Sequence, residues 1–281
     1  MKYLFFIISL SSLILCSEQN DQSIEIVTKD GNIFLGVIVD ENGEQYILKT
    51  KDGITISIPK SSVIKKSYLE TKEFNGEVYR ADPNKSMYFF APSAFPIGQN
   101  QAYCRDFCLF FPSYNRGFGN TSIQAGAFIF PAMDVVDIPL VLSAKYSLQN
   151  NILNLATGFM YVKMPVDGEN SFGTGLLFLT NTLGNNFNHF STSLGWGYIK
   201  TDSDWEFSEN PLFNFASNFR VKDNLAIVGE FWKFPDVDLS LSPFMLAARF
   251  IGRQIAVDVG FITTLENDGI PFPLLNFTYH F

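Results

Sequence analysis

The last nine residues of the chain alternate between apolar and polar side chains. Leu275, Phe277, Tyr279 and Phe281 occupy every second position, and polar residues separate them. A period of two is the pattern of a β-strand, whose successive side chains point to opposite faces. Here the apolar face continues to the final residue and ends in three aromatic rings. This pattern is typical of the closing strand of a transmembrane β-barrel, where aromatic side chains meet the membrane interface.

Alternation of the same kind recurs from Met87 onward, in runs long enough to cross a bilayer at a tilt. We predict an antiparallel transmembrane β-barrel over 87–281 with about twelve strands, an even number as in bacterial single-chain barrels. The predicted strands are 87–95, 102–112, 120–130, 138–148, 151–163, 171–183, 187–200, 211–221, 224–234, 243–251, 254–265 and 272–281.

The connections between these strands fall into two alternating sets. One set is short and neutral or basic: Asn115-Arg116, Gln149-Asn150, Gly184-Asn185, Lys222-Asp-Asn224 and Gly252-Arg253. The other set is longer and acidic: it holds Asp134, Asp137, Asp167, Glu169, Asp202, Asp204, Glu206, Glu209, Asp236, Asp238, Glu266 and Asp268, with no Lys or Arg inside it. Short periplasmic turns and longer outer loops are typical of membrane barrels. We therefore expect both ends of the barrel to be periplasmic.

The faces that alternate with the lipid-facing side chains hold polar and charged residues. On 138–148, for example, Leu140, Leu142 and Tyr146 form one face and Ser143 and Lys145 the other. We expect the lumen to be lined by Lys145, Arg220, Glu230, Arg249, Asp258 and His280. The run 102–112 does not separate apolar from charged side chains in this way, because it places Arg105 on the same face as Tyr103 and Phe107.

The alternating runs in residues 22–68 are shorter than those after Met87, and we interpret these residues as a separate unit. Five short alternating runs are separated by Asp-Gly and Asn-Gly turns, which are strong hairpin signals. We predict a small five-stranded SH3-like or Sm-like β domain, which acts as a spacer or packing module. Residues 69–86 are polar and are interpreted as a linker, and the position of the barrel ends would place the small domain in the periplasm.

Residues 1–17 begin with a basic residue and continue with a short apolar run, which is the pattern of an export signal peptide. The run is shorter than the ~20 residues of a spanning helix. Cys16 also permits a lipoprotein interpretation, which Leu15 disfavours. Cys104 and Cys108 would lie ~13 Å apart on a strand, beyond the ~7 Å of a disulfide, so we expect free thiols.

Composition excludes some classes of function. The net charge of −8 argues against a nucleic-acid partner. With 17% charged residues, the chain is poorer in charge than the quarter or so of ordinary globular proteins. Only His189 and His280 are available as histidine ligands, and we expect neither a metal nor a cofactor. Clustered carboxylates at Asp202-Ser-Asp-Trp-Glu206 suit Ca²⁺, but they equally suit a solvated acidic loop.

The Tyr88-Phe-Phe-Ala-Pro-Ser-Ala-Phe95 run, the Leu109-Phe-Phe111 run and the Phe-rich ending resemble an uncharacterised family of bacterial outer-membrane β-barrel proteins that are porin-like. The resemblance implies a location in the outer membrane and supplies no catalytic residues. Phe277, Tyr279 and Phe281 resemble the signal by which the barrel-assembly machinery recognises such chains.

His189-Phe-Ser191 has the spacing of the catalytic pair of outer-membrane phospholipase A. The Asn-Gly that follows the serine in that family is replaced by Thr192-Ser193, and the strand pattern points the pair inward. We therefore expect no enzyme activity.

The expected function is a porin-like channel for small solutes. The alternative is a structural or adhesive surface protein with a filled lumen, and a more remote one is a lipid hydrolase. The expected partners are outer-membrane lipid and the assembly machinery, with lipopolysaccharide bridged to the acidic loops through divalent cations as a further candidate.

Overall fold

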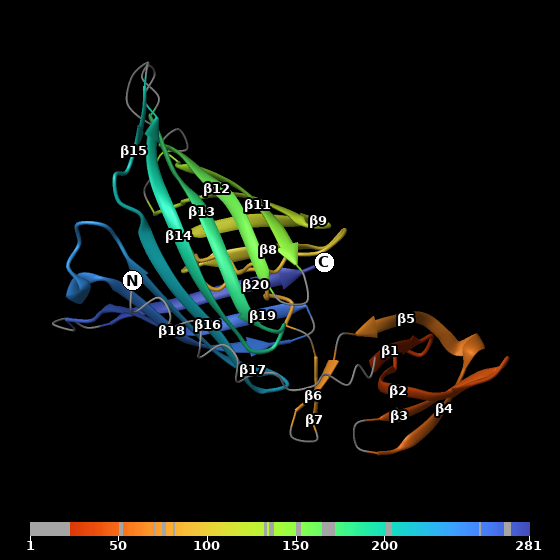
Figure 1. Ribbon diagram of the computed structural model, residues 1–281. Helices are drawn as coiled ribbons and strands as arrows, with labels where there is room; N and C mark the ends of the chain where they lie inside the picture. Colours follow the sequence, from red (N-terminus) through yellow and green to blue (C-terminus); the bar gives the residue numbers. More distant parts are fainter. Residues whose placement is uncertain are drawn as a thin grey trace. The chain divides into compact units, whose positions relative to one another are not determined.

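The computed structural model describes residues 23–50, 53–69, 71–74, 77–80, 82–131, 134, 138–149, 153–164, 172–200, 204–252, 254–266 and 271–281 (Figure 1). The chain divides after residue 81 into two compact units. Within the described part of the chain, no helix is long and apolar enough to cross a membrane. The predicted signal peptide 1–17 with Cys16 lies outside the described residues, as do Asp137, Asn150, Asp167, Glu169, Asp202, Arg253 and Asp268 of the predicted connections.

The first unit contains a five-stranded antiparallel sheet in the order β4-β3-β2-β1-β5. Its strands are β1 (Ser23–Thr28), β2 (Ile33–Glu41), β3 (Gln45–Thr50), β4 (Thr55–Pro59) and β5 (Val63–Leu69). Each of the five predicted strands is confirmed. Gly31 and Gly53, in the turns between them, adopt positive φ angles that suit glycine. The likeness to SH3 or Sm domains stays a prediction.

The core of this sheet consists of Ile24, Ile26, Leu48 and Ile58, each at most 4% exposed. On its surface, Lys60 and Lys66 lie 2.9 and 3.6 Å from the carboxylate of Glu41. The hydrogen bond from Lys60 is the main cause of a lowered pKa of Glu41. The stretch predicted as a linker, 69–86, includes a two-stranded hairpin of β6 (Thr71–Phe74) and β7 (Glu77–Arg80).

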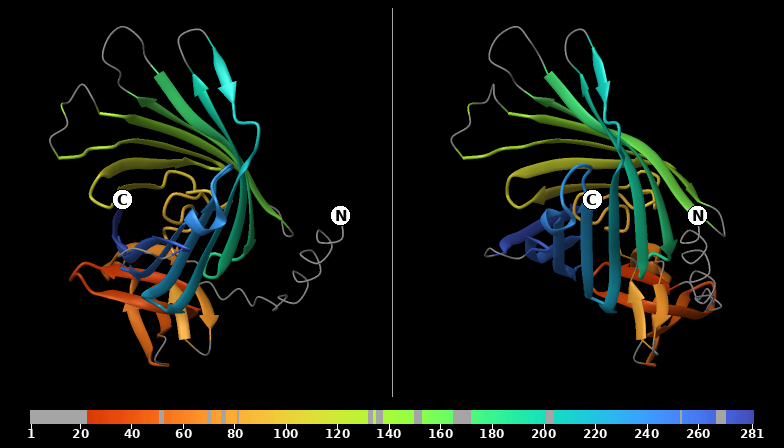
Figure 2. Two further views of the ribbon diagram at one scale, coloured as in Figure 1. Left: turned by 90° about the vertical axis from the view of Figure 1, so that its left-hand side faces the viewer. Right: turned by 60° about the vertical axis from the view of Figure 1, so that its left-hand side comes forward.

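The second unit is a closed antiparallel barrel of twelve strands (Figure 2). The pairing of β20 with β8 completes the circle, and every strand pairs with its two neighbours. A short extra strand, β15 (Trp205–Phe207), extends the sheet beyond β14. The barrel strands are β8 (Ala102–Phe107), β9 (Phe111–Phe118), β10 (Thr121–Ala127), β11 (Leu140–Gln149), β12 (Asn154–Met164), β13 (Phe172–Gly184), β14 (His189–Lys200), β16 (Leu212–Lys222), β17 (Leu225–Lys233), β18 (Pro243–Ile251), β19 (Ile255–Thr264) and β20 (Phe272–His280).

Two of the predicted strands are wrong, and the two errors cancel in the count. The run 102–112 is a hairpin of β8 and β9, because Cys108 and Leu109 take positive φ angles of 53° and 66° and turn the chain. Arg105 shares a face with Tyr103 and Phe107 because that whole face of β8 points into the barrel: the three side chains are 6%, 3% and 6% exposed. The turn between β9 and β10 accordingly lies at 119–120, and Asn115 and Arg116 belong to β9.

The run 87–95 is the other error, because it forms no barrel strand. It has a single isolated bridge, between Met87 and Pro92. Proline has no backbone N–H to donate to a strand ladder, and the run contains Pro92 in its middle. Residues 82–98 instead lie inside the barrel, where the orange-yellow trace is enclosed by the strands in both views of Figure 2. We call residues 82–98 the plug.

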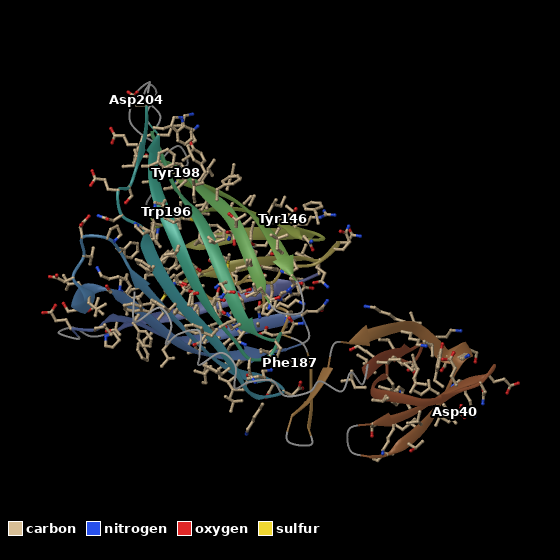
Figure 3. The ribbon with its side chains drawn as sticks, in the orientation of Figure 1. Asp40, Tyr146, Phe187, Trp196, Tyr198 and Asp204 are labelled. Atoms are coloured by element: carbon tan, nitrogen blue, oxygen red, sulfur yellow. The ribbon has the colours of Figure 1, made fainter. Side chains whose placement is uncertain are left out.

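Side chains alternate along the barrel strands as predicted. On β11, Leu140, Leu142 and Tyr146 are 51%, 54% and 47% exposed, whereas Lys145 and Ser147 are buried. Figure 3 labels Tyr146 and Trp196, two of the rings that remain exposed on the outer surface of the barrel. Cys104 is exposed, Cys108 is partly buried, and both thiols are free as expected.

Small inward residues give the plug its space. A Cβ atom placed on Gly117 of β9 would lie 2.0 Å from the carbonyl oxygen of Gly98 and 2.8 Å from its nitrogen. Both contacts are to backbone, which cannot rotate away as a side chain can. Gly197 on β14 also faces inward, but nothing lies within 3.9 Å of a Cβ added there.

We therefore predict that Gly117→Ala destabilises the barrel and Gly197→Ala does not. Overpacking of a filled interior costs about 1–3 kcal/mol, and the backbone contact places Gly117→Ala at the upper end. The measurement is the midpoint of thermal unfolding in detergent, followed by the mobility of the folded barrel on gels. Equal midpoints for the two variants would contradict the position of the plug against β9.

Candidate functional site

The barrel interior is the candidate site, because its charged side chains converge on the plug. The plug contains no regular structure, and its internal backbone bonds are few, such as Tyr88 N to Ala91 O at 2.9 Å and Ser93 N to Ser86 O at 3.2 Å. A buried backbone group without a partner is costly. The barrel wall supplies the missing partners.

Lys145 on β11 binds the plug through its carbonyl groups. Its ammonium group donates to the carbonyl oxygens of Ser86, Ser93 and Phe95 at 2.9, 2.7 and 2.8 Å. An ammonium group has three donors, so all of its capacity is used on the plug backbone. Lys145 is 6% exposed, and its charge is balanced by carbonyl dipoles in these contacts.

Glu230 on β17 accepts hydrogen bonds from backbone N–H groups of the plug. Its carboxylate accepts hydrogen bonds from the nitrogen of Phe89 at 2.8 Å and from that of Phe90 at 3.1 Å. The indole N–H of Trp232 donates to the same carboxylate. Glu230 is 1% exposed, so a negative charge in the wall is directed at one bend of the plug.

Arg249 on β18 and Asp258 on β19 form a buried ion pair at a shared register position. The guanidinium donates twice to the carboxylate, at 2.7 and 3.0 Å. It also donates to the carbonyl of Tyr88 at 3.1 Å and lies 3.9 Å from the carboxylate of Asp82. Paired donors of this kind are strong and geometrically specific.

A second arginine, on β8, donates to the same plug carbonyl. Arg105 on β8 donates to Tyr88 O at 2.9 Å and to the side-chain oxygen of Asn276 on β20 at 2.9 Å. Asn276 in turn donates to Asp258 at 2.6 Å. Four barrel strands, β8, β20, β19 and β18, are thus joined in one network around the Tyr88 carbonyl.

The six residues predicted to line the lumen are all on inward positions, but they do not form one cluster. Lys145, Glu230 and Arg249 each bind a different part of the plug, and Asp258 orients Arg249. His280 bonds through Nε2 to the side-chain oxygen of Asn84 at 3.0 Å. Arg220 donates to the carbonyls of Lys222 and Asp223 and so holds the β16–β17 turn.

Sequence reasoning missed Arg105, Asp82 and Tyr88. The irregular position of Arg105 in its predicted strand was the available signal. Asp82 and Tyr88 lie in segments predicted as linker and as strand. Nothing in their spacing indicates burial in a lumen.

The His189-Phe-Ser191 pair points into the barrel, where it contacts the plug. The Ser191 hydroxyl lies 2.7 Å from the phenol oxygen of Tyr88 and 2.6 Å from the hydroxyl of Thr182. His189 Nδ1 lies 3.1 Å from the carbonyl oxygen of Asn185. Among the described residues, no group of three or more His, Cys, Asp or Glu side chains has a metal-binding arrangement.

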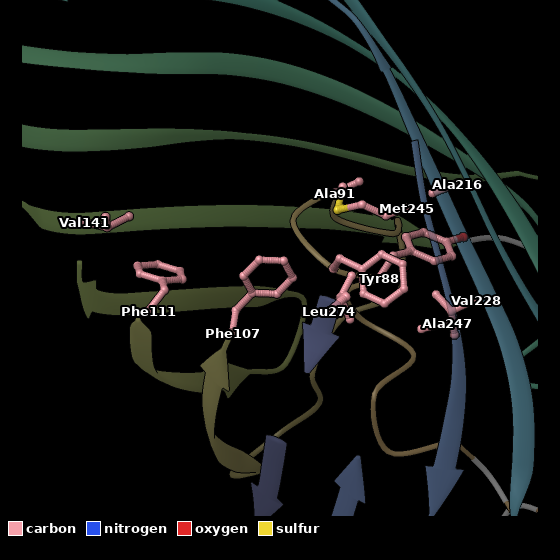
Figure 4. Close-up of a cluster of buried hydrophobic side chains, with 11 residues drawn as sticks. Tyr88, Ala91, Phe107, Phe111, Val141, Ala216, Val228, Met245, Ala247 and Leu274 are labelled. Atoms are coloured by element: carbon pink, nitrogen blue, oxygen red, sulfur yellow. The ribbon is translucent and has the colours of Figure 1, made fainter. Parts of the chain in front are cut away.

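Beyond the plug, the lumen contains a cavity of about 660 Å³. In contrast to the polar surroundings of the plug, its walls are mainly apolar, and Phe107, Phe111, Val141 and Met245 belong to the buried cluster shown in Figure 4. Aromatic rings pack together in this wall: the ring centroids of Phe90 and Phe107 lie 4.2 Å apart, and those of Phe111 and Phe128 lie 4.5 Å apart. The interior is therefore polar around the plug and apolar above it.

No protein-family model matches the sequence, and no curated protein matches it. Among solved structures, the chain is similar to the outer-membrane protein Omp33 of Acinetobacter baumannii, with a TM-score of 0.37, 9% identity, and 64% of this chain and 96% of that chain covered. It is similar to the trimer form of OmpT, an outer-membrane protein of Vibrio cholerae, with a TM-score of 0.35, 10% identity, and coverage of 92% and 96%. A triple mutant of the Rhodopseudomonas blastica porin gives a TM-score of 0.34, 9% identity, and coverage of 93% and 99%. These structural neighbours are outer-membrane β-barrels, but the likeness is too distant to inform function.

Proposed function

We propose that the protein is a bacterial outer-membrane β-barrel with a gated lumen: a porin-like conduit for small solutes that the plug closes at rest. The observation that carries this proposal is the set of buried wall charges whose hydrogen bonds go to the plug backbone. Lys145 alone makes three such bonds. The small domain before the plug would lie in the periplasm.

The outer surface of the barrel supports the membrane location. Large apolar side chains are exposed on strand after strand, whereas soluble proteins rarely expose apolar patches beyond a few hundred Å². A closed barrel satisfies all its wall hydrogen bonds internally, as a lipid environment requires. The exposed side chains include Leu140, Leu142, Tyr146, Phe159, Leu177, Leu179, Leu183, Phe190, Trp196, Phe213, Phe215, Phe219, Phe250, Ile255, Val259, Phe277, Tyr279 and Phe281.

The chemistry of the wall supports a gate. Burying charge is expensive, and apolar side chains of similar volume often fill an interior at lower cost. Charges directed at a backbone segment have a second use: if the plug moves away, Lys145, Glu230 and Arg105 become a hydrated polar lining. The plug has no strand ladder to break, so it can leave without opening the barrel.

The alternative is a structural or adhesive surface protein whose lumen is filled permanently. The same contacts favour it if the plug never moves. The two functions therefore differ in whether weakening the plug opens a path for ions. Lipid and the barrel-assembly machinery are the proposed partners in both cases, with lipopolysaccharide a further candidate at the acidic loops.

A depth-dependent substitution tests the membrane location. Leu177 lies near the middle of β13 and Leu183 near its turn end, and they are 42% and 40% exposed. Arginine on the lipid face costs about 2–4 kcal/mol at the midplane and about 0–1 kcal/mol near the interface. We expect Leu177→Arg to lower folding stability in lipid vesicles much more than Leu183→Arg. Similar small effects of both, or solubility of the mature protein without detergent, would rule out a membrane barrel.

Conductance tests the gate. We expect no steady conductance from the refolded protein in a planar bilayer. Lys145→Met leaves three buried plug carbonyls without a donor, at about 1–3 kcal/mol each. A total of about 3 kcal/mol corresponds to roughly a hundredfold shift in the equilibrium, so open events should become at least that much more frequent.

Lys222→Met is the matched control, because Lys222 is exposed at the turn end of β16. It removes the same charge from the same barrel without touching the plug, and it should behave as the wild type. If Lys145→Met forms a folded barrel that does not conduct, the structural protein with a filled lumen is supported instead. Steady conductance of the wild type would mean that the plug does not close the lumen.

A further inference from the structure

The cavity beyond the plug is bounded by plug residues on one side and by the barrel strands around it. Its volume of about 660 Å³ lies within the range of about 300–1,000 Å³ that is typical of ligand pockets. Lys145, beside the plug, and Val141, toward the outer loops, both line it from β11. Four residues of strand separate them, which corresponds to ~13 Å. The space therefore extends at least ~13 Å along β11.

The walls of this cavity select for apolar molecules. Val141, Met160, Leu176, Met245 and Ile262 project into it from five strands. An apolar molecule that packs against these side chains removes apolar surface from water, which is favourable. Methionine side chains adapt to irregular shapes, so two of them in the wall suit a flexible chain.

The floor offers little to a charged ligand. The ammonium group of Lys145 already donates to three carbonyls, and Arg105, which also lines the cavity, already donates to the carbonyl of Tyr88 and to the side-chain oxygen of Asn276. The ring of Phe90 also lines the cavity and packs against Phe107. It is 39% exposed although the residue lies inside the barrel, so its free face borders the cavity.

We propose that this cavity binds an unbranched aliphatic chain, which it recognises without a charged head group. The inference rests on the proposed function only in that it names the cargo of the same lumen. A chain in the cavity touches Phe90, whose nitrogen is held by Glu230, and Trp232, whose indole is held by the same carboxylate. The ligand therefore contacts the plug at the point where the wall holds it.

Trp232 makes the binding measurable. The chain has three tryptophans, at 196, 205 and 232, and only Trp232 lines the cavity among the described lining residues. In the variant Trp196→Phe/Trp205→Phe, fluorescence therefore reports on the cavity alone. The probe is 1-bromododecane, an uncharged and unbranched chain whose bromine quenches tryptophan fluorescence, titrated into the protein in detergent-free amphipol.

We expect saturable quenching of Trp232 that unlabelled dodecane reverses. Gly197→Phe should reduce the quenching at least tenfold, because Gly197 lines the cavity and has room for a side chain. Gel mobility of the unheated protein shows that this variant is folded. The dodecane competition needs no cavity variant, so it tests the proposal even if Gly197→Phe does not fold.

Quenching that rises linearly without saturation, or that dodecane does not reverse, overturns the proposal. Reversal by stearate but not by dodecane also overturns it, since a charged head group would then be required. These outcomes are independent of conductance: a silent Lys145→Met barrel argues against the gate and leaves the quenching result unchanged.

Discussion

The barrel depends on the pairing of buried wall charges with the backbone of the plug. An irregular segment inside a barrel has backbone groups that no strand ladder satisfies, and each would be costly if left without a partner. Lys145 satisfies three plug carbonyls, Glu230 satisfies the N–H groups of Phe89 and Phe90, and Arg105 and Arg249 share the Tyr88 carbonyl. The charges and the plug each make the burial of the other possible.

The same pairing divides the lumen into two chemical zones. Around the plug the wall is polar, and its side chains are engaged. Beyond Phe90 the wall is apolar, and the space above it is open. A polar solute would meet the apolar zone first from the loop end, whereas an aliphatic chain would fit that zone and stop at the plug. This order of zones is why the cargo proposed for the lumen is apolar although its deepest residues are charged.

Sequence reasoning succeeded where the alternation of side chains was long and regular. The period of two placed ten of the barrel strands and the faces of β11, because one surface of each strand meets water or the plug and the other is apolar. It failed at 87–95 and 102–112. Tyr88 and Phe89 have no polar residue between them to indicate alternation. Their burial comes from barrel residues that are distant in sequence, such as Arg249, which lies 161 residues from Tyr88. The hairpin at Cys108 and Leu109 has no glycine, asparagine or proline in the positions of positive φ, so no turn signal was visible there.

The charges of the lumen could be predicted, but their partners could not. Alternation assigns Lys145, Glu230 and Arg249 to the interior, yet it does not reveal that a segment of the chain occupies that interior. A disulfide between the plug and the wall tests this central claim most directly. The nitrogen of Ala94 lies 2.7 Å from the hydroxyl of Thr182 on β13, so Ala94→Cys/Thr182→Cys, in a chain with Cys104→Ser and Cys108→Ser, should form the bond on oxidation of the folded barrel. Two thiols that stay free in a correctly folded barrel would contradict the plugged lumen.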